Sequence, residues 1–176
     1  MKSREFMLNE RSNLFVVQNN VTISEKLHIH KKSLIIKDIN FENIKLKILT
    51  RNIRFERCSF KNTSLSTNGK GNNIAFCWSI WFANQRKTLV IKHYKMVIFW
   101  NCLFHSIRTR DVNAFILLKG VEIVHVNSCS FINITGSMLT VDSSSAVHVR
   151  RSSMQNVSYR EPCMCLHHFL LNYLPK

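Results

Sequence analysis

Acidic residues are scarce in this sequence and missing from its middle. The 176 residues include 10 Asp plus Glu against 25 Lys plus Arg, which gives a net charge of +15. No acidic residue lies between Arg57 and Arg110. Glycoside hydrolases work with a pair of carboxylates, and the sequence shows no such pair. The scarcity of acids therefore argues against an enzyme of that class.

Glycine and proline are also rare, at 4 and 2 residues, which excludes a loop-rich or low-complexity protein. No apolar run approaches the ~18 residues of a transmembrane helix. The longest candidates are "AFILL" and "HHFLLNYL". The opening "MKSREFMLNERSN" lacks the apolar segment of a secretory signal. We expect either an intracellular protein or a fragment that is incomplete at its N-terminus.

The positive charge favours a polyanionic partner. A surplus of this size attracts nucleic acid, acidic glycans or anionic membrane surfaces. A solvated face that merely keeps the protein soluble is the alternative. Arg86, Lys87, Lys92 and Lys95 gather within the acid-free stretch. We expect these four side chains to form a polyanion-binding face.

A short frame recurs along the sequence. In "NSCSFINITG" the anchor Phe131 follows Cys129 by two residues and precedes Asn133 by two. Similar frames recur at intervals of about 19 to 27 residues. Their anchors are Val17, Phe41, Phe60, Phe82, Phe104, Phe131 and Met154.

The length and composition of this repeat favour a solenoid of β-coils. Helical repeats are usually longer, at roughly 33 to 47 residues, and need a 3.6-residue periodicity that is absent here. A leucine-rich repeat has a similar length but places Leu at several fixed offsets. These units instead place Phe, Cys and Ile at a period of two. We predict an all-β fold, a parallel β-helix of about seven coils.

Stacking explains the frame physically. Equivalent positions in successive coils lie about 4.8 Å apart, and residues two apart point to the same face of a strand. Phe131 and Cys129 are therefore expected to point inward, in one stack of large and one stack of small side chains. Asn133 is expected at the corner after the strand, where Asn tolerates a left-handed backbone and bonds to its equivalents in a ladder.

The stretches "ERCSFKNTS", "WNCLFHSI" and "NSCSFINITG" resemble coils of the right-handed parallel β-helix family with the pectin-lyase-like fold. They look most like the coils of polymorphic outer-membrane-type extracellular repeat proteins. The resemblance implies a right-handed β-helix in an extracellular or cell-surface setting. Enzymes with this fold act on acidic polysaccharides, so the resemblance also implies this substrate class should the chain be an enzyme. Their lyases use clustered Asp with an Arg or Lys base, and their hydrolases use paired carboxylates.

The resemblance covers residues 15–158 and leaves a lead-in or cap over 1–14 and a tail over 159–176. A solenoid needs caps at its open ends. Apolar residues recur at helical spacing in the tail, which predicts a short capping helix; a truncated or frameshifted tail is the alternative. These residues are Leu166, Phe169, Leu170, Tyr173 and Leu174.

Three of the six cysteines, Cys58, Cys102 and Cys129, occupy one offset of the repeat. We interpret them as buried packing residues, because a reactive cysteine needs an exposed site that lowers its pKa. The cluster "CMCLHH" over 163–168 offers zinc ligands, but its spacing fits no standard zinc site. We predict no metal and no cofactor.

Four Asn residues carry the N-x-[ST] signal for N-glycosylation. Three of them share the corner offset of the repeat, where Asn followed by Thr or Ser also serves turn chemistry. Asn20 lies off this frame and is the better acceptor. The candidates are Asn20, Asn62, Asn133 and Asn156.

The sequence thus predicts a non-enzymatic extracellular or cell-surface β-helix module for adhesion or for binding acidic glycans. The alternatives are a degenerate polysaccharide lyase or glycoside hydrolase, and a structural fragment of a larger repeat protein. No nucleophile motif, phosphate-binding loop or nucleic-acid motif occurs. Most aromatic residues follow the inward frame, so nucleic acid is not the expected partner.

Overall fold

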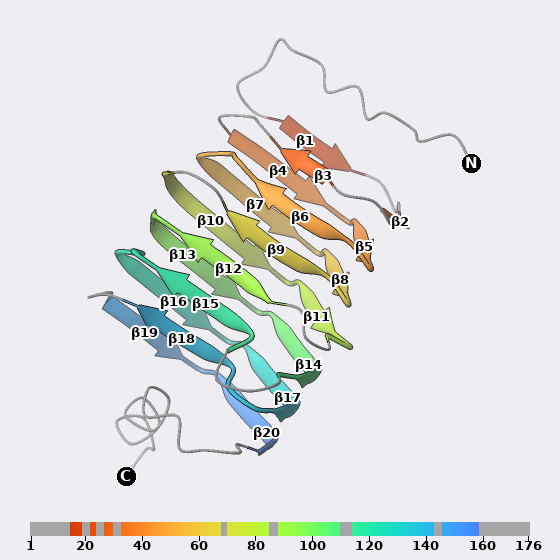
Figure 1. Ribbon diagram of the computed structural model, residues 1–176, viewed down its shortest axis with the longest axis vertical. Coiled ribbons are helices and arrows are strands. Elements are labelled where there is room, and N and C mark those ends of the chain that lie inside the picture. The colour runs from red at the N-terminus through yellow and green to blue at the C-terminus, as the bar shows by residue number, and fades with distance from the viewer. Residues whose placement is uncertain are drawn as a thin grey trace.

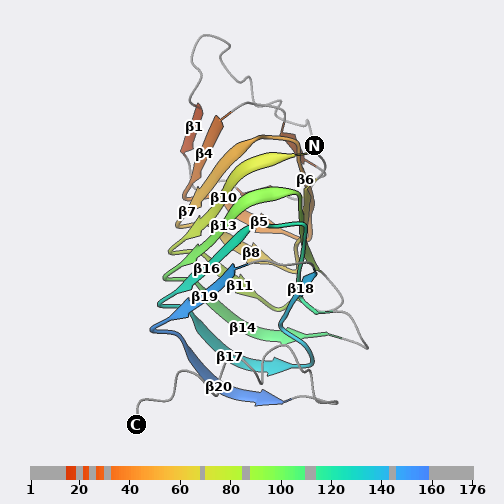
Figure 2. The ribbon, with the colours of Figure 1, turned by 90° about the vertical axis from the view of Figure 1, so that its left-hand side faces the viewer.

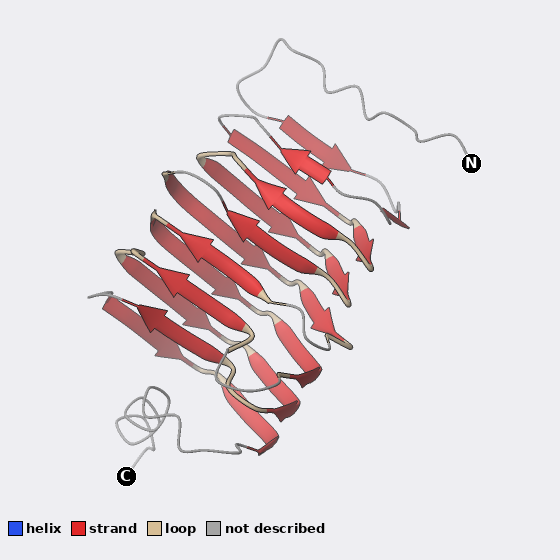
Figure 3. Cartoon of the chain, in the orientation of Figure 1, coloured by secondary structure: helices blue, strands red, loops and turns tan. Residues whose placement is uncertain are grey.

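The fold is a parallel β-solenoid (Figure 1), seen in a computed structural model. For residues before Ser33, and for Asp142, the backbone alone is described. Every regular element among the described residues is a strand (Figure 3). The described residues are 15–18, 22–23, 27–29, 33–67, 70–84, 88–109, 114–142 and 146–158.

Three parallel sheets form the faces of the solenoid, and each coil adds one strand to each sheet. Figure 2 shows the strands of sheet A stacked in order from β1 to β19. Sheet A holds β1 (Phe15–Gln18), β4 (Ser33–Lys37), β7 (Asn52–Glu56), β10 (Gly71–Cys77), β13 (Tyr94–Trp100), β16 (Ile123–Asn127) and β19 (Ala146–Arg150). Sheet B holds β2 (Thr22–Ile23), β5 (Asn40–Glu42), β8 (Ser59–Lys61), β11 (Ile80–Phe82), β14 (Leu103–Arg108), β17 (Ser130–Thr135) and β20 (Ser153–Ser158). Sheet C holds β3 (Leu27–Ile29), β6 (Lys45–Ile48), β9 (Ser64–Thr67), β12 (Leu89–Lys92), β15 (Ile116–Lys119) and β18 (Leu139–Asp142).

The predicted parallel β-helix is confirmed, with slightly fewer full coils than the expected seven. Five complete coils run from β4 to β18. Before them, β2 has only 2 residues, and after them β19 and β20 have no third strand among the described residues. The predicted lead-in over 1–14 and the predicted capping helix over 159–176 lie outside the described residues.

Each coil turns its corners on single residues with a left-handed backbone. Four such residues are Asn, with φ between 44° and 56°. Asn43 and Asn62 directly follow β5 and β8, whereas Asn133 and Asn156 make the bend within the longer β17 and β20. Asn62 Nδ2 donates a hydrogen bond to Asn43 Oδ1 at 2.7 Å, and Asn156 Nδ2 donates to Asn133 Oδ1 at 3.1 Å. The predicted corner Asn and its ladder are therefore confirmed as two separate pairs.

Two ladders of aromatic rings fill the core. Phe41 and Phe60 stack on sheet B at 5.1 Å, and Phe55 and Phe76 stack on sheet A at the same spacing. The ladders meet edge to face, as in the contact of Phe55 with Phe60 at 5.4 Å. Stacked and T-shaped pairs are both favourable ring geometries. Phe104 and Phe131 continue the sheet B ladder at 5.0 Å, so the predicted Phe stack is confirmed at those positions.

The prediction of Phe82 as an inward anchor is wrong, because the register places Trp81 opposite Phe60. Trp81 is fully buried and stacks on Phe60 at 3.9 Å, while Phe82 lies on the outer face against His105. Both residues are aromatic, so the local sequence did not distinguish them. The shift also moves Asn84 inward, where its Oδ1 accepts a hydrogen bond from Thr63 N at 2.7 Å.

The first anchor, Val17, was also placed wrongly. Val17 belongs to β1 and pairs with Ile36 in sheet A. The residue level with Phe41 in sheet B is Ile23. The frame "FVVQNN" has the alternating apolar residues that strands of sheets A and B share, so this pattern did not show to which sheet the segment belongs.

The cysteine stack is confirmed as a packing feature. Cys58, Cys102 and Cys129 are buried and free, with Ser79 at the equivalent place between Cys58 and Cys102. Burial raises the pKa of Cys58 to about 11. A hydrogen bond with the Cys129 thiol, together with burial, raises the pKa of Cys102 well above its usual range. These thiols lack the exposed setting that a reactive cysteine needs.

The aromatic core yields a stability prediction. Trp81→Ala removes a fully buried ring from the ladder, so we expect the free energy of unfolding to fall by about 3–5 kcal/mol. Trp78→Ala is the matched control, because Trp78 is 51% exposed and its loss should change stability by no more than about 0.5 kcal/mol. Urea unfolding followed by circular dichroism measures both. Equal losses in the two variants would contradict the assignment of Trp81 to the core.

Candidate functional site

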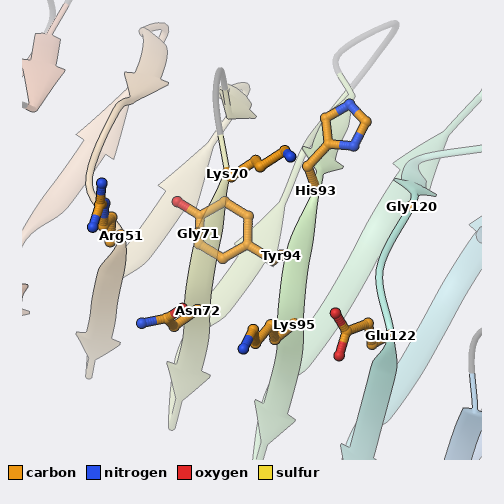
Figure 4. A pocket seen from close by; sticks show the side chains of 9 residues that line it. All are labelled: Arg51, Lys70, Gly71, Asn72, His93, Tyr94, Lys95, Gly120 and Glu122. Atoms are coloured by element: carbon orange, nitrogen blue, oxygen red, sulfur yellow. The ribbon is translucent and has the colours of Figure 1, made fainter.

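A pocket of about 420 Å³ lies at the corner where the coils pass from sheet C to sheet A. Figure 4 shows its side chains, which come from four successive coils. It lies at the start of β10 and β13, the two longest strands of the structure. Its lining residues are Arg51, Lys70, Gly71, Asn72, His93, Tyr94, Lys95, Gly120 and Glu122.

The parallel register brings these distant residues together. Four residues of the lining form a row across sheet A, one from each coil. Each stands one residue before a position that pairs with its equivalent in the next coil. The row consists of Arg51, Asn72, Lys95 and Glu122. The backbone of Asn72 donates to the carbonyl of Arg51 at 2.7 Å, which fixes the row at that step. With one strand spacing per step, the row spans about 14 Å.

Tyr94 and Gly71 form the floor of the pocket. The Tyr94 ring is buried and packs directly over Gly71, where a Cβ atom would lie 2.2 Å from the ring. The Tyr94 hydroxyl donates a hydrogen bond to the carbonyl of Thr50. Burial raises the pKa of Tyr94 to about 12. Glycine is therefore needed at position 71 for the ring to close the floor.

His93 and Gly120 form one wall of the pocket. Both residues have a left-handed backbone, with φ of 57° and 58°. A Cβ atom on Gly120 would lie 3.0 Å from His93 Nδ1, which is closer than ordinary contact. His93 is exposed and its ring packs close to the Gly120 backbone. The imidazole therefore adds ring nitrogens that can form hydrogen bonds beside the lysines of the pocket.

The charge of the pocket is predominantly positive. Arg51, Lys70 and Lys95 are exposed, and none of them forms an ion pair within the described part of the chain. Glu122 supplies the one carboxylate of the lining. Ion pairs elsewhere use other cations, as in Arg57 with Asp38. Three unpaired cations around one pocket leave their charge available to an anion.

Of the four residues predicted to bind polyanions, the structure places one in the pocket. Lys95 lines the pocket, whereas Lys92 is exposed at the end of β12 and does not line it. Arg86 and Lys87 lie outside the described residues. Sequence reasoning missed Arg51 and Lys70, because they lie in different coils and only the register of the sheets brings them together. A register built on Trp81 would have aligned Arg51 with Asn72 and Lys95.

The carboxylates of the early coils lie in ion pairs. Glu56 is held by Lys37 at 2.9 Å and by Arg54 at 2.7 Å, and Arg57 binds Asp38 at 2.6 Å. Hydrogen bonds from Lys37 and Arg57 lower the pKa of Glu56 and of Asp38. A glycosidase needs one carboxyl group with a raised pKa as its acid. This pair of carboxylates does not meet that requirement.

Within the described residues, no group of three or more His, Cys, Asp or Glu could hold a metal ion. The cluster "CMCLHH" over 163–168 lies outside those residues. The part of the chain that the structure describes also contains no helix long and apolar enough to cross a membrane.

Three of the four glycosylation candidates lie on the outer surface of a corner. Asn133 and Asn156 are exposed, and Asn62 is half-buried. The side-chain nitrogens of Asn62 and Asn156 already donate to the neighbouring Asn of the ladder. Asn20 lies outside the described residues. Asn133 is the best of the described candidates. It is exposed, and in the Asn ladder its side-chain oxygen accepts while its side-chain nitrogen does not donate.

No protein-family model, curated protein or solved structure matches this chain. What the chain binds is therefore inferred from its own side chains.

The contact of Gly71 with Tyr94 predicts a local loss of stability. Gly71→Ala places a methyl group within 2.6 Å of three ring atoms of Tyr94, so we expect a loss of about 1–3 kcal/mol in unfolding free energy. Asn73→Ala, an exposed position on the same strand, is the control. In a Tyr94→Ala background the same Gly71→Ala change should cost much less, because the clash is gone. An undiminished cost would contradict the proposed clash.

Tyr94 also predicts a pH dependence. Its pKa is about 12 in the folded protein against 10.0 for a free tyrosine. A raised pKa gives a contribution to stability that is complete below pH 10 and is lost as the pH rises to 12. Over this range the unfolding free energy of the wild type should fall more steeply than that of Tyr94→Phe. Denaturant titrations at fixed pH measure this difference, and parallel curves would rule out the contribution of Tyr94.

Proposed function

We propose that this chain is a non-enzymatic β-solenoid module that binds acidic glycans at a cell surface or outside the cell. The observation that carries the proposal is the pocket at the corner of sheets C and A. There Arg51, Lys70 and Lys95 stand unpaired within the described structure, around a floor made by Tyr94. The ligand class follows from the positive charge and the neutral polar groups beside it.

The shape of the row fits an extended acidic chain better than a single small anion. Arg51 and Lys95 stand two coils apart, which is about 10 Å along the solenoid axis. Asn72 lies between them with an exposed amide that offers a donor and an acceptor for hydroxyl groups. The guanidinium of Arg51 provides the paired donors that carboxylate or sulfate groups accept.

Rigidity supports binding at this surface. The residues of the row stand at the ends of strands that are hydrogen-bonded on both sides. A site held in place by paired strands loses little backbone freedom when a ligand binds. The solenoid therefore presents its cations in a fixed order.

The extracellular setting is supported by surface chemistry. Asn133 begins an N-x-[ST] signal on an exposed corner, so a glycan at this position would extend into solvent. The four described cysteines are buried, so oxidants outside the cell would have little access to them.

Heparin and polygalacturonate affinity chromatography test the proposal. The triple variant Arg51→Gln, Lys70→Gln, Lys95→Gln removes the three pocket cations. The matched control, Lys45→Gln, Lys47→Gln, Arg108→Gln, removes equal charge from residues that do not line the pocket. We expect the pocket variant to bind about ten-fold more weakly and to elute at lower salt. Three exposed charges at roughly 0.2–1 kcal/mol each contribute about 0.6–3 kcal/mol, and a ten-fold change corresponds to about 1.4 kcal/mol.

The control variant should elute close to the wild type. Equal losses in both triple variants would show that only net charge matters and would overturn the pocket as the binding site. A wild-type protein that both columns fail to retain at low salt would overturn the proposed function. Turnover of a uronic-acid polymer would instead support a degenerate lyase or hydrolase.

A further inference from the structure

Two tryptophans stand on the outside of the solenoid. Trp78 is 51% exposed and Trp100 is 49% exposed, whereas Trp81 is fully buried. Trp78 and Trp100 lie in neighbouring coils at the corner between sheets A and B, where the backbone of Trp78 donates to the carbonyl of Trp100 at 2.9 Å. Large exposed aromatic side chains that lie close to one another are typical of binding surfaces.

A shared hydrogen-bond partner orients the two indoles. When the Asn101 amide turns its oxygen toward them, that oxygen accepts from Trp100 Nε1 at 2.8 Å and from Trp78 Nε1 at 3.1 Å. The N–H edges of both rings are thereby occupied. About half of each tryptophan remains exposed, and the shared partner holds both indoles in place for stacking.

The backbone at this corner does not require a tryptophan. Trp78 has a left-handed backbone with φ of 50°, a conformation that is unfavourable for a bulky residue. Other coils place short polar or charged residues at the same corner, such as Asn101 and Ser128. The turn itself is therefore made without a tryptophan in the neighbouring coils.

We infer that Trp78 and Trp100 form a stacking platform for a sugar ring of the same acidic glycan that the pocket binds. This inference rests on the proposed function. The two sites share strands: β10 and β13 begin in the pocket and end at the tryptophans. Six residue steps at about 3.3 Å separate them, or about 20 Å.

The surface between the two sites suits an extended chain lying along the strands. The outward residues of β10 and β13 there are Asn73, Ala75, Met96 and Ile98, of which Asn73 is exposed and the other three are half-buried. None of them carries a charge that would repel an acidic glycan. Small and apolar side chains let a sugar chain pass close to the sheet.

The neighbours of the platform favour a sugar over a nucleobase. Asn127 pairs with Trp100 in the next coil, and Ser128 follows it. Amide and hydroxyl groups bind sugar hydroxyls as both donors and acceptors, while the C–H groups of a pyranose face pack on an indole. Single-stranded nucleic acid also stacks on aromatic rings, and the experiment separates the two classes.

Tryptophan fluorescence gives a direct test. The chain has three tryptophans, and the two exposed ones are open to acrylamide quenching. A purified oligogalacturonate, titrated into the full chain, should reduce that quenching as it binds. Trp78→Ala with Trp100→Ala should weaken binding by about ten-fold or more. The double change to Phe should restore part of the affinity, because a ring face remains. Phe82→Ala, on the outer face of sheet B, is the aromatic control and should bind as the wild type does.

The outcomes separate the platform from the pocket. If oligogalacturonate binds through the pocket cations, yet the Trp78→Ala, Trp100→Ala variant binds equally well and quenching does not change, the platform is overturned and the proposed function stands. If the wild type binds no acidic glycan, both are overturned. If oligothymidylate protects the tryptophans at lower concentration than oligogalacturonate does, the sugar assignment is overturned.

Discussion

The whole structure depends on the stacking of equivalent side chains one strand spacing apart. Parallel strands in neighbouring coils lie about 4.8 Å apart, and the ring centroids of Phe55 and Phe76 lie 5.1 Å apart. An aromatic ring in one coil therefore packs directly on the ring in the next. Because the two ladders also meet edge to face, each ring touches partners along the axis and across the core. This packing sets the register of the coils that carry the rings.

The packing of the core also determines which outer side chains lie next to one another. A slip of one residue would turn every inward side chain outward, so the Phe ladders hold the outer rows in line as well. Arg51 and Lys95 come within reach of one ligand only because β7 and β13, through β10, are aligned in register. The same alignment places Trp78 beside Trp100 at the far ends of β10 and β13. Both candidate binding surfaces are consequences of core packing.

The described coils differ in how well sequence alone predicts them. Coils whose anchor is a single Phe, such as Phe60 and Phe131, were predicted correctly with their Cys and Asn neighbours. The coil of Trp81 was shifted by one residue, because Trp81 and Phe82 fit the local pattern equally well. The pairing with Phe60 settles the choice, since the larger ring stacks inside the ladder. With Trp81 inward, Asn84 also points into the core, and the left-handed residue of this coil is Ala83.

The sequence by itself determined the class of fold. Its apolar alternation, its repeat length and its corner Asn residues are local properties that each coil carries alone. Only the tertiary structure decided which side chains meet on the surface. Residues of the pocket come from four coils and share no local pattern, so their meeting depends on register and on the path of each corner. The tertiary structure likewise decided exposure: Trp78 stands at a left-handed corner and is 51% exposed, whereas Trp81 lies in β11 and is fully buried.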